Sequence, residues 1–164
     1  MVKKSNLWSF IVCLLLVGLS FQALYAAANQ TWQWAPDAFT LWLLSIVVFI
    51  IAIIGFQDKS SKKARWRSWL TVFIIVPLSI VFLFGVAVNT MAREHIETTE
   101  SPDHRTTIDF YTLNGGAATS ISVKGIVNGP LWFKKTVYNE MPMHEVDVEW
   151  LDNDTIKINR YTLD

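Results

Sequence analysis

Three long apolar runs and one region of alternating residues divide the chain. The runs cover residues 7–28, 38–56 and 69–91, and none of them contains a charged side chain. Each has close to the roughly 20 residues that an α-helix needs to cross the hydrocarbon of a bilayer. None carries the polar stripe, repeating about every 3.6 residues, of a helix on a globular protein. We therefore expect three transmembrane helices, within residues 1–28, 38–56 and 69–91.

The segment 57–68 between the second and third runs is rich in basic residues, which are Lys59, Lys62, Lys63, Arg65 and Arg67. Short loops rich in Lys and Arg stay on the cytoplasmic side of a membrane. The link 29–37 contains neither residue type and is expected on the opposite side. Three crossings then place the N-terminus in the cytoplasm and residues 92–164 on the extracytoplasmic side of the cell membrane.

The first run also fits a second interpretation. Lys3 and Lys4 precede it, and Ala26, Ala27 and Ala28 end it, which is the pattern of a secretory signal with a small-residue cleavage site. The run is long for a signal, which favours an uncleaved helix. Cleavage after Ala28 would leave two spans and would not change the side on which residues 92–164 lie.

The last third of the chain alternates between apolar and polar residues, as β-strands do. Residues 92–100 are polar without clear periodicity and are expected to form a stalk. Turn residues at 101–103 then open a β domain over residues 101–164, in which Gly125 suggests a bulge or the close approach of another group. The expected strands lie within 107–113, 119–127, 131–138, 145–151 and 155–158. The predicted fold is therefore an α-helical membrane anchor followed by a small antiparallel all-β domain.

Charge is distributed unevenly, although the 14 basic and 14 acidic residues cancel over the whole chain. Residues 1–91 contain seven basic and two acidic side chains, whereas residues 92–164 contain seven basic and twelve acidic ones. An acidic domain repels phosphate backbones, so no nucleic-acid partner is expected. Cys13 is the single cysteine, which excludes an intrachain disulfide and a zinc site with several thiolates.

Residues with catalytic chemistry are scattered. His95, His104 and His144 have no metal-ligand spacing, and no Ser-His-Asp or Cys-His pattern is present. The spans hold no Asp, Glu, Lys, Arg or His, which argues against ion-coupled transport. A calcium site is conceivable among the acidic residues of segment 147–154, but a solvated strand face is the simpler interpretation. We expect no enzyme activity, no metal and no cofactor.

Two turns offer a candidate interaction surface. Asn114, Gly115 and Gly116 form one, and Trp132 follows the other. Lys134 and Lys135, next to Trp132, are typical of an edge strand but could also contact anionic headgroups. Turn geometry alone would also explain the glycines.

The motifs of the last third resemble an uncharacterised family of Firmicutes membrane proteins, a domain of unknown function. The resemblance rests on SPD at 101–103, TIDFY at 107–111, NGGAATS at 114–120, GPLWFKK at 129–135, VEWL at 148–151 and IKIN at 156–159. His104 and Arg160 stand where such turns commonly carry Gly. The resemblance implies a Gram-positive cell membrane and assigns no activity.

These observations predict a membrane-anchored protein with a binding or interaction role in the cell envelope. The expected partners are the lipid bilayer and another membrane or envelope protein. One alternative is an immunity or accessory subunit that acts through its transmembrane helices. A less favoured alternative is a metal-dependent enzyme of the envelope.

Overall fold

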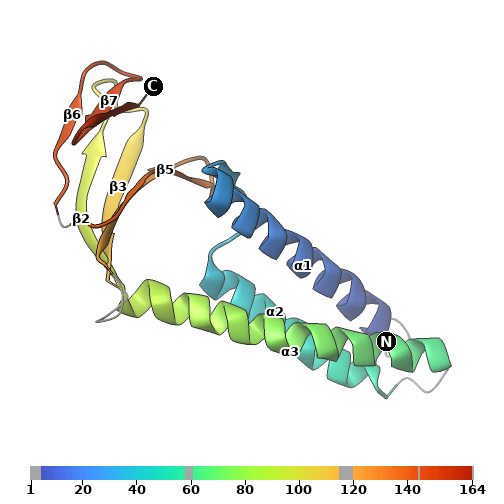
Figure 1. Ribbon diagram of the computed structural model, residues 1–164. Helices are drawn as coiled ribbons and strands as arrows, with labels where there is room; N and C mark the ends of the chain where they lie inside the picture. The colour runs from blue at the N-terminus through green and yellow to red at the C-terminus, as the bar shows by residue number, and fades with distance from the viewer. Residues whose placement is uncertain (1–4, 58–60, 115–119, 144, 164) are drawn as a thin grey trace. The chain divides into compact units, whose positions relative to one another are not determined.

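A computed structural model describes residues 5–57, 61–114, 120–143 and 145–163 of the chain. The chain divides into two compact units. The helical unit contains residues 1–23 and 35–87, and the sheet unit contains residues 24–34 and 88–164. The sheet unit thus includes the last residues of two helices besides the strands (Figure 1).

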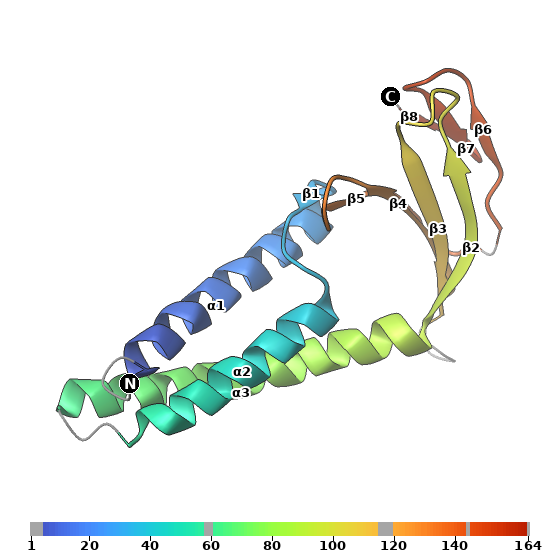
Figure 2. The same cartoon turned by 180° about the vertical axis from the view of Figure 1, so that it is seen from behind.

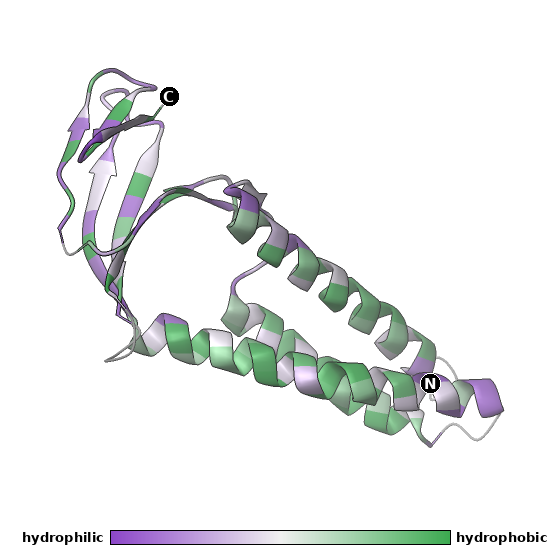
Figure 3. Ribbon diagram, in the orientation of Figure 1, coloured by the Kyte–Doolittle hydropathy of each residue, from purple (hydrophilic) through white to green (hydrophobic). Residues whose placement is uncertain are grey.

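Three long helices account for the three apolar runs. They are α1 (Ser5–Asn29), α2 (Ala38–Gly55) and α3 (Lys62–Met91), and each is long and apolar enough to cross a membrane (Figure 3). Asp37 begins α2 as its N-cap, because its carboxylate accepts hydrogen bonds from the Phe39 amide at 3.2 Å and the Thr40 hydroxyl at 2.6 Å. This confirms the prediction of three apolar helices.

The basic segment is largely helical, which corrects the loop predicted over residues 57–68. Helix α3 begins at Lys62, so Lys62, Lys63, Arg65 and Arg67 lie in its first turns. The Ser61 hydroxyl accepts a hydrogen bond from the Ala64 amide at 3.1 Å and so caps the helix. Lys and Arg also favour helix, so the helix starts well before the apolar run does. Lys59 lies outside the described residues.

The helical unit has a narrow core and a wide apolar exterior. Six buried side chains form its centre, namely Cys13, Leu16, Leu41, Val48, Ile75 and Phe82. Close packing at one end depends on Gly55, because a Cβ there would lie 2.8 Å from the Ser68 hydroxyl and 3.1 Å from the Asn6 Cβ. Small residues of this kind allow membrane helices to approach closely.

Two antiparallel sheets form the rest of the sheet unit. The five-stranded sheet has the order β1-β5-β4-β3-β2, and the three-stranded sheet has the order β6-β7-β8 (Figure 2). Their bounds are β1 Trp32–Gln33, β2 Arg93–Glu100, β3 Thr107–Leu113, β4 Ser122–Asn128, β5 Lys134–Glu140, β6 Val148–Trp150, β7 Ile156–Ile158 and β8 Tyr161–Leu163. The predicted antiparallel all-β region is therefore confirmed.

Both sheets contribute to one core. Ile108, Phe110, Val123 and Tyr138 come from the five-stranded sheet, and Ile156 and Ile158 come from the three-stranded sheet. Residues 108 and 110 alternate with polar residues on β3, as the period of a half-buried strand requires. We call the opposite side of the five-stranded sheet, which carries Asp109 and Tyr111, its outer face.

Two polar segments belong to the five-stranded sheet, contrary to prediction. Residues 93–100 form strand β2 rather than a stalk, and they pair with β3 along its whole length. Most of its side chains are exposed on both faces, so the strand shows no alternation in the sequence. Within the link 29–37, Trp32 and Gln33 form β1 and pair with Lys135 and Lys134. Because the paired residues are about a hundred positions apart in the chain, the pairing leaves no signal in the local sequence.

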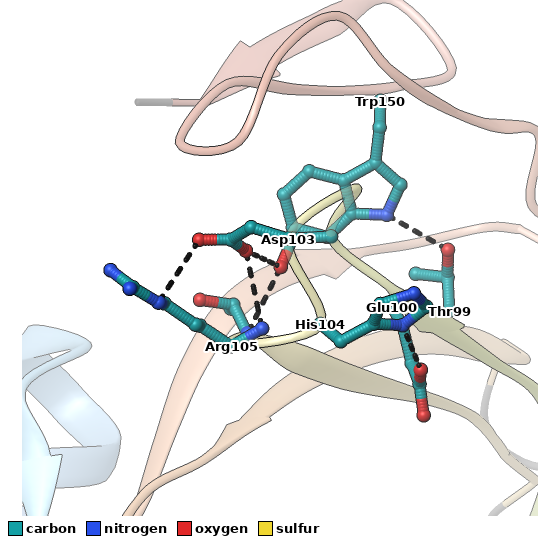
Figure 4. Close-up of polar contacts among 8 residues, drawn as sticks. Thr99, Glu100, Asp103, His104, Arg105 and Trp150 are labelled. Atoms are coloured by element: carbon teal, nitrogen blue, oxygen red, sulfur yellow. Dashed lines mark hydrogen bonds and ion pairs between the residues drawn. The ribbon is translucent and has the colours of Figure 1, made fainter.

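The turn between β2 and β3 confirms the role predicted for residues 101–103. The Ser101 hydroxyl donates to Asp103 at 2.7 Å, and the Arg105 amide donates to the same carboxylate at 3.1 Å (Figure 4). These hydrogen bonds lower the pKa of Asp103. His104 has a φ of 57°, which explains why glycine would suit this position. Beside the turn, the Trp150 indole donates to the Thr99 hydroxyl at 2.9 Å and joins the two sheets.

Gly125 lies opposite a β-bulge, but the extra residue of that bulge is Val137 on β5 and not the glycine itself. The pairing of β4 with β5 shifts register between Gly125 and Ile126. A Cβ at Gly125 would lie 2.9 Å from the Phe110 ring, so the absence of a side chain also makes room for the largest buried residue of the core. The close approach of another group, which a glycine within a strand also suggests, is therefore what the structure shows at Gly125.

Candidate binding surfaces of the sheet unit

An aromatic surface forms where β1 meets β5. Trp32 and Trp34 come from the segment that follows α1, while Trp132 and Phe133 precede β5. The Trp132 indole N–H donates to the Trp34 carbonyl at 2.8 Å, which fixes the two segments to each other. We call these four residues, together with Pro130, the aromatic edge. Trp34 and Trp132 remain exposed, so the edge presents apolar surface to its surroundings.

The local backbone explains how the aromatic edge packs. A Cβ at Gly129 would lie 2.5 Å from the Trp32 ring, so only glycine leaves that ring in place. Leu131 has a φ of 60°, which ends the extended conformation and delays β5 to Lys134, three residues later than predicted. Trp32, Trp34, Pro130 and Phe133 line an open concavity of about 510 Å3.

The two turns of the predicted interaction surface lie at opposite ends of β4. Asn114 follows Leu113, which pairs with Ser122 at the start of β4. Trp132 precedes Lys134, which pairs with Asn128 at the end of β4. Six residues of strand separate these ends, a distance of roughly 20 Å. The structure therefore does not join Asn114 and Trp132 into one surface; Gly115 and Gly116 lie outside the described residues.

The edge of β5 at Lys134 and Lys135 is covered, because β1 pairs with both residues. The interpretation of these lysines as residues of an open edge is therefore wrong at this point of the strand. Lys134 is exposed and lies next to the aromatic edge, where a positive charge can contact anionic groups.

A second surface, which the sequence analysis missed, crosses the outer face of the five-stranded sheet. His95, Tyr111, Lys124 and Asn139 pair in one row from β2 to β5. The Arg93 guanidinium carbon lies 3.4 Å from the centre of the Tyr111 ring. Arg93 and His95 alternate along β2, which is the local signal for this row, but the polar residues between and around them hide it in the sequence.

Asp109 is the acidic residue nearest to this row on β3. Its two carboxylate oxygens accept hydrogen bonds from Thr98 at 2.7 Å and from Asn128 at 2.6 Å. Burial opposes ionisation of Asp109, but these two bonds and the charges of His95 and Lys134 outweigh it, so the pKa of Asp109 is lowered. Asp109 is therefore engaged with other groups than Arg93 and Lys124.

Lys124 is half-buried and has a cationic neighbour. Its burial lowers the pKa of its ammonium group, and the positive charge of Arg93 lowers that pKa further. Within the described parts of the chain, no carboxylate forms an ion pair with either side chain. Two cations held close without an anion are electrostatically unfavourable.

Neither His95 nor His104 belongs to a group of metal-ligating side chains within the described residues. His95 contacts the Thr98 hydroxyl at 2.9 Å, and His104 contacts the Glu100 carboxylate at 2.9 Å. His144 lies outside the described residues. Over the ranges that the structure describes, no three His, Cys, Asp or Glu side chains are grouped closely enough to hold a metal ion.

Comparison with known proteins places the chain in a family. A model of a family of unknown function, DUF5412, matches residues 59–164. The chain belongs to this family. The match covers α3 and strands β2 to β8, so Arg93, Tyr111 and Lys124 lie inside it, whereas Trp32 and Trp34 lie outside. No curated protein and no solved structure matches the chain.

Proposed function

We propose that this DUF5412 protein is a three-span protein of a Gram-positive cell membrane whose sheet unit acts, without catalysis, as a binding module on the extracytoplasmic side. One observation supports the topology. Strand β1 begins three residues after α1, β2 begins two residues after α3, and both strands belong to one sheet. This pairing favours an arrangement with the C-terminal ends of α1 and α3 on the same side of the membrane, as three successive crossings give.

Charge supports the choice of side. Four basic residues stand in the first turns of α3, at the end remote from β2. The link that contains β1 has neither Lys nor Arg. By the distribution of basic residues in membrane proteins, the start of α3 is cytoplasmic and the sheet unit is not.

The aromatic edge supports a position of the sheet unit close to the bilayer. Trp32 and Trp34 lie in the short segment between α1 and α2, which reaches only the headgroup region if both helices cross. Tryptophan favours that region. Because Trp132 is hydrogen-bonded to Trp34, the β4–β5 turn is held there as well. The lipid bilayer is then a partner of the sheet unit and not of the helices alone.

Labelling of single cysteines with a membrane-impermeant maleimide in intact cells tests the topology. Asn153→Cys, in the exposed turn before β7, is expected to react, whereas Gln57→Cys, after α2, is expected to react only after the membrane is opened. The unaltered chain is the blank, since Cys13 is buried in the helical unit. Labelling of Gln57→Cys but not of Asn153→Cys in closed cells would reject the proposal. The mass of the mature protein separates the uncleaved chain from one cleaved after Ala28.

A swap of the helices separates the binding module from the alternative in which the helices contact a partner membrane protein. The replacement anchor must retain residues 29–37, because β1 belongs to the sheet. Loss of cellular function in a chain that keeps both β1 and residues 88–164 would favour the alternative in which the helices contact a partner membrane protein. Retained function would favour the sheet unit. An enzyme is a weaker candidate, and combined replacement of His95, His104 and His144 with full retention of function would exclude catalysis by these residues.

A further inference from the structure

We propose that Arg93 and Lys124, on either side of Tyr111, form a binding site for a phosphate group at the end of α3. The register of the five-stranded sheet brings them together. Lys124 on β4 pairs directly with Tyr111 on β3, so their Cβ atoms are roughly 5 Å apart. Arg93 on β2 lies over the other side of the same tyrosine, with its guanidinium 3.4 Å from the ring centre.

The donors of this site point to an oxyanion. Arg93 offers a planar fork that matches phosphate oxygens, Lys124 offers a compact charge, and His95 and Asn139 extend the same row with further N–H groups. No carboxylate in the described chain forms an ion pair with Arg93 or Lys124, and Asp109, on the same face of β3 as Tyr111, is occupied by Thr98 and Asn128. A bound phosphate would remove the repulsion between the two cations.

The position of the site suggests the source of the phosphate. Arg93 follows the last residue of α3, Met91, by two residues, a reach of at most about 7 Å. The 30 residues of α3 measure about 45 Å along the axis, which is close to the thickness of a bilayer with its headgroups. Arg93 would then emerge at the level of the phospholipid phosphates. This step rests on the proposed topology, whereas the affinity for phosphate does not.

The test measures lipid binding to the full chain in a neutral detergent by native mass spectrometry. The probes are phosphatidylglycerol, a phosphate-free diglucosyl diacylglycerol and, in a separate titration, inorganic phosphate. The unaltered protein is expected to retain phosphatidylglycerol at least about tenfold more tightly than the glycolipid, since a charge-assisted pair contributes about that factor. Arg93→Gln and Lys124→Gln are each expected to weaken that binding by about tenfold.

Lys157→Gln is the matched control, because it removes one positive charge from the three-stranded sheet, where Lys157 lies 3.9 Å from Glu149. It is expected to leave phosphatidylglycerol binding unchanged. Equal retention of both lipids by the unaltered protein, together with no binding of inorganic phosphate, would overturn the proposal, and neither measurement needs a variant to fold. So would an equal loss in all three variants. Binding of inorganic phosphate alone, abolished by Arg93→Gln, would support the site and assign it to a soluble ligand.

The two proposals fail separately. If Asn153→Cys is labelled only in opened cells but the lipid titration gives the expected selectivity, the topology is wrong and the phosphate site stands. If the labelling is as expected but the protein does not distinguish the two lipids, the proposed topology stands and the phospholipid is rejected as the ligand.

Discussion

The helical unit and the sheet unit use the same apolar residue types for opposite purposes. In the helical unit, large side chains such as Phe73, which is 78% exposed, mostly face outward. In the sheet unit, Phe110 is fully buried between two sheets. Most of each helix is coloured as hydrophobic, apart from hydrophilic stretches such as the first turns of α3, whereas hydrophobic and hydrophilic colours alternate along the strands (Figure 3). The first unit is therefore adapted to an apolar solvent, whereas the second makes its own apolar interior.

This difference determines what each unit tolerates. In a membrane, exchange of one apolar side chain for another on the outside of a helix changes little, because lipid fills the space. In the interior of a small sheet domain, a lost methylene leaves a cavity that is only partly closed. Single substitutions can separate these two situations, and four experiments are given below from the largest expected effect to the smallest.

The sharpest contrast compares two phenylalanines. Phe110→Ala is expected to destabilise the sheet unit by about 3–5 kcal/mol, because it empties the centre of the shared core. Phe73→Ala on the outside of α3 is expected to leave the thermal midpoint nearly unchanged. Unfolding of the full chain in detergent, followed by near-UV circular dichroism, measures both. Similar losses in the two variants would show that the outside of α3 is packed against protein.

A pair of glycines tests the packing of the helices. Gly55→Leu is expected to cost about 1–3 kcal/mol, because the new side chain would collide with Ser68 and Asn6. Gly18→Leu is the control, since nothing lies within 4 Å of a Cβ at that position. Thermal unfolding at 222 nm reports on the helices. If Gly55→Leu is as stable as the control, these helix ends do not pack closely.

The hydrogen bond between the two sheets has a smaller effect. Trp150→Phe keeps an aromatic ring but removes the donor to the Thr99 hydroxyl, so a loss of about 1 kcal/mol in the free energy of unfolding is expected. Thr99→Val removes the acceptor. The double variant is expected to be little worse than either single one, as coupled partners require. Strictly additive losses would mean that the bond contributes nothing.

Acid sensitivity of the sheet unit is the smallest of the four effects. The folded pKa of Asp109 is lowered, so its contribution is complete above the ordinary value of 3.8 and is lost as the pH falls through the lowered pKa. Asp109→Asn is therefore expected to flatten the loss of near-UV signal on acidification below pH 4. Thr98→Val, which removes one of the two donors, should give an intermediate slope. An unchanged acid profile in Asp109→Asn would refute this assignment.

The sequence by itself determined the three apolar helices, the turn at residues 101–103 and the close approach of a neighbouring group at Gly125. Each of these follows from local rules: an apolar run of membrane length, side chains that close a turn, and a glycine within a strand. The start of α3 was misplaced, because the capping hydroxyl of Ser61 and the helical preference of Lys and Arg outweighed the boundary of the apolar run.

Only the tertiary structure decided the membership of β1 and β2 in the five-stranded sheet, and with it both candidate surfaces. Trp34 and Trp132 are 98 residues apart, and Arg93 and Lys124 lie on different strands. Their approach depends on strand register, which is set by the burial of Phe110 and its neighbours between the sheets. Local patterns carry the propensity of a segment, whereas the choice of its partner strand comes from the core that all of them share.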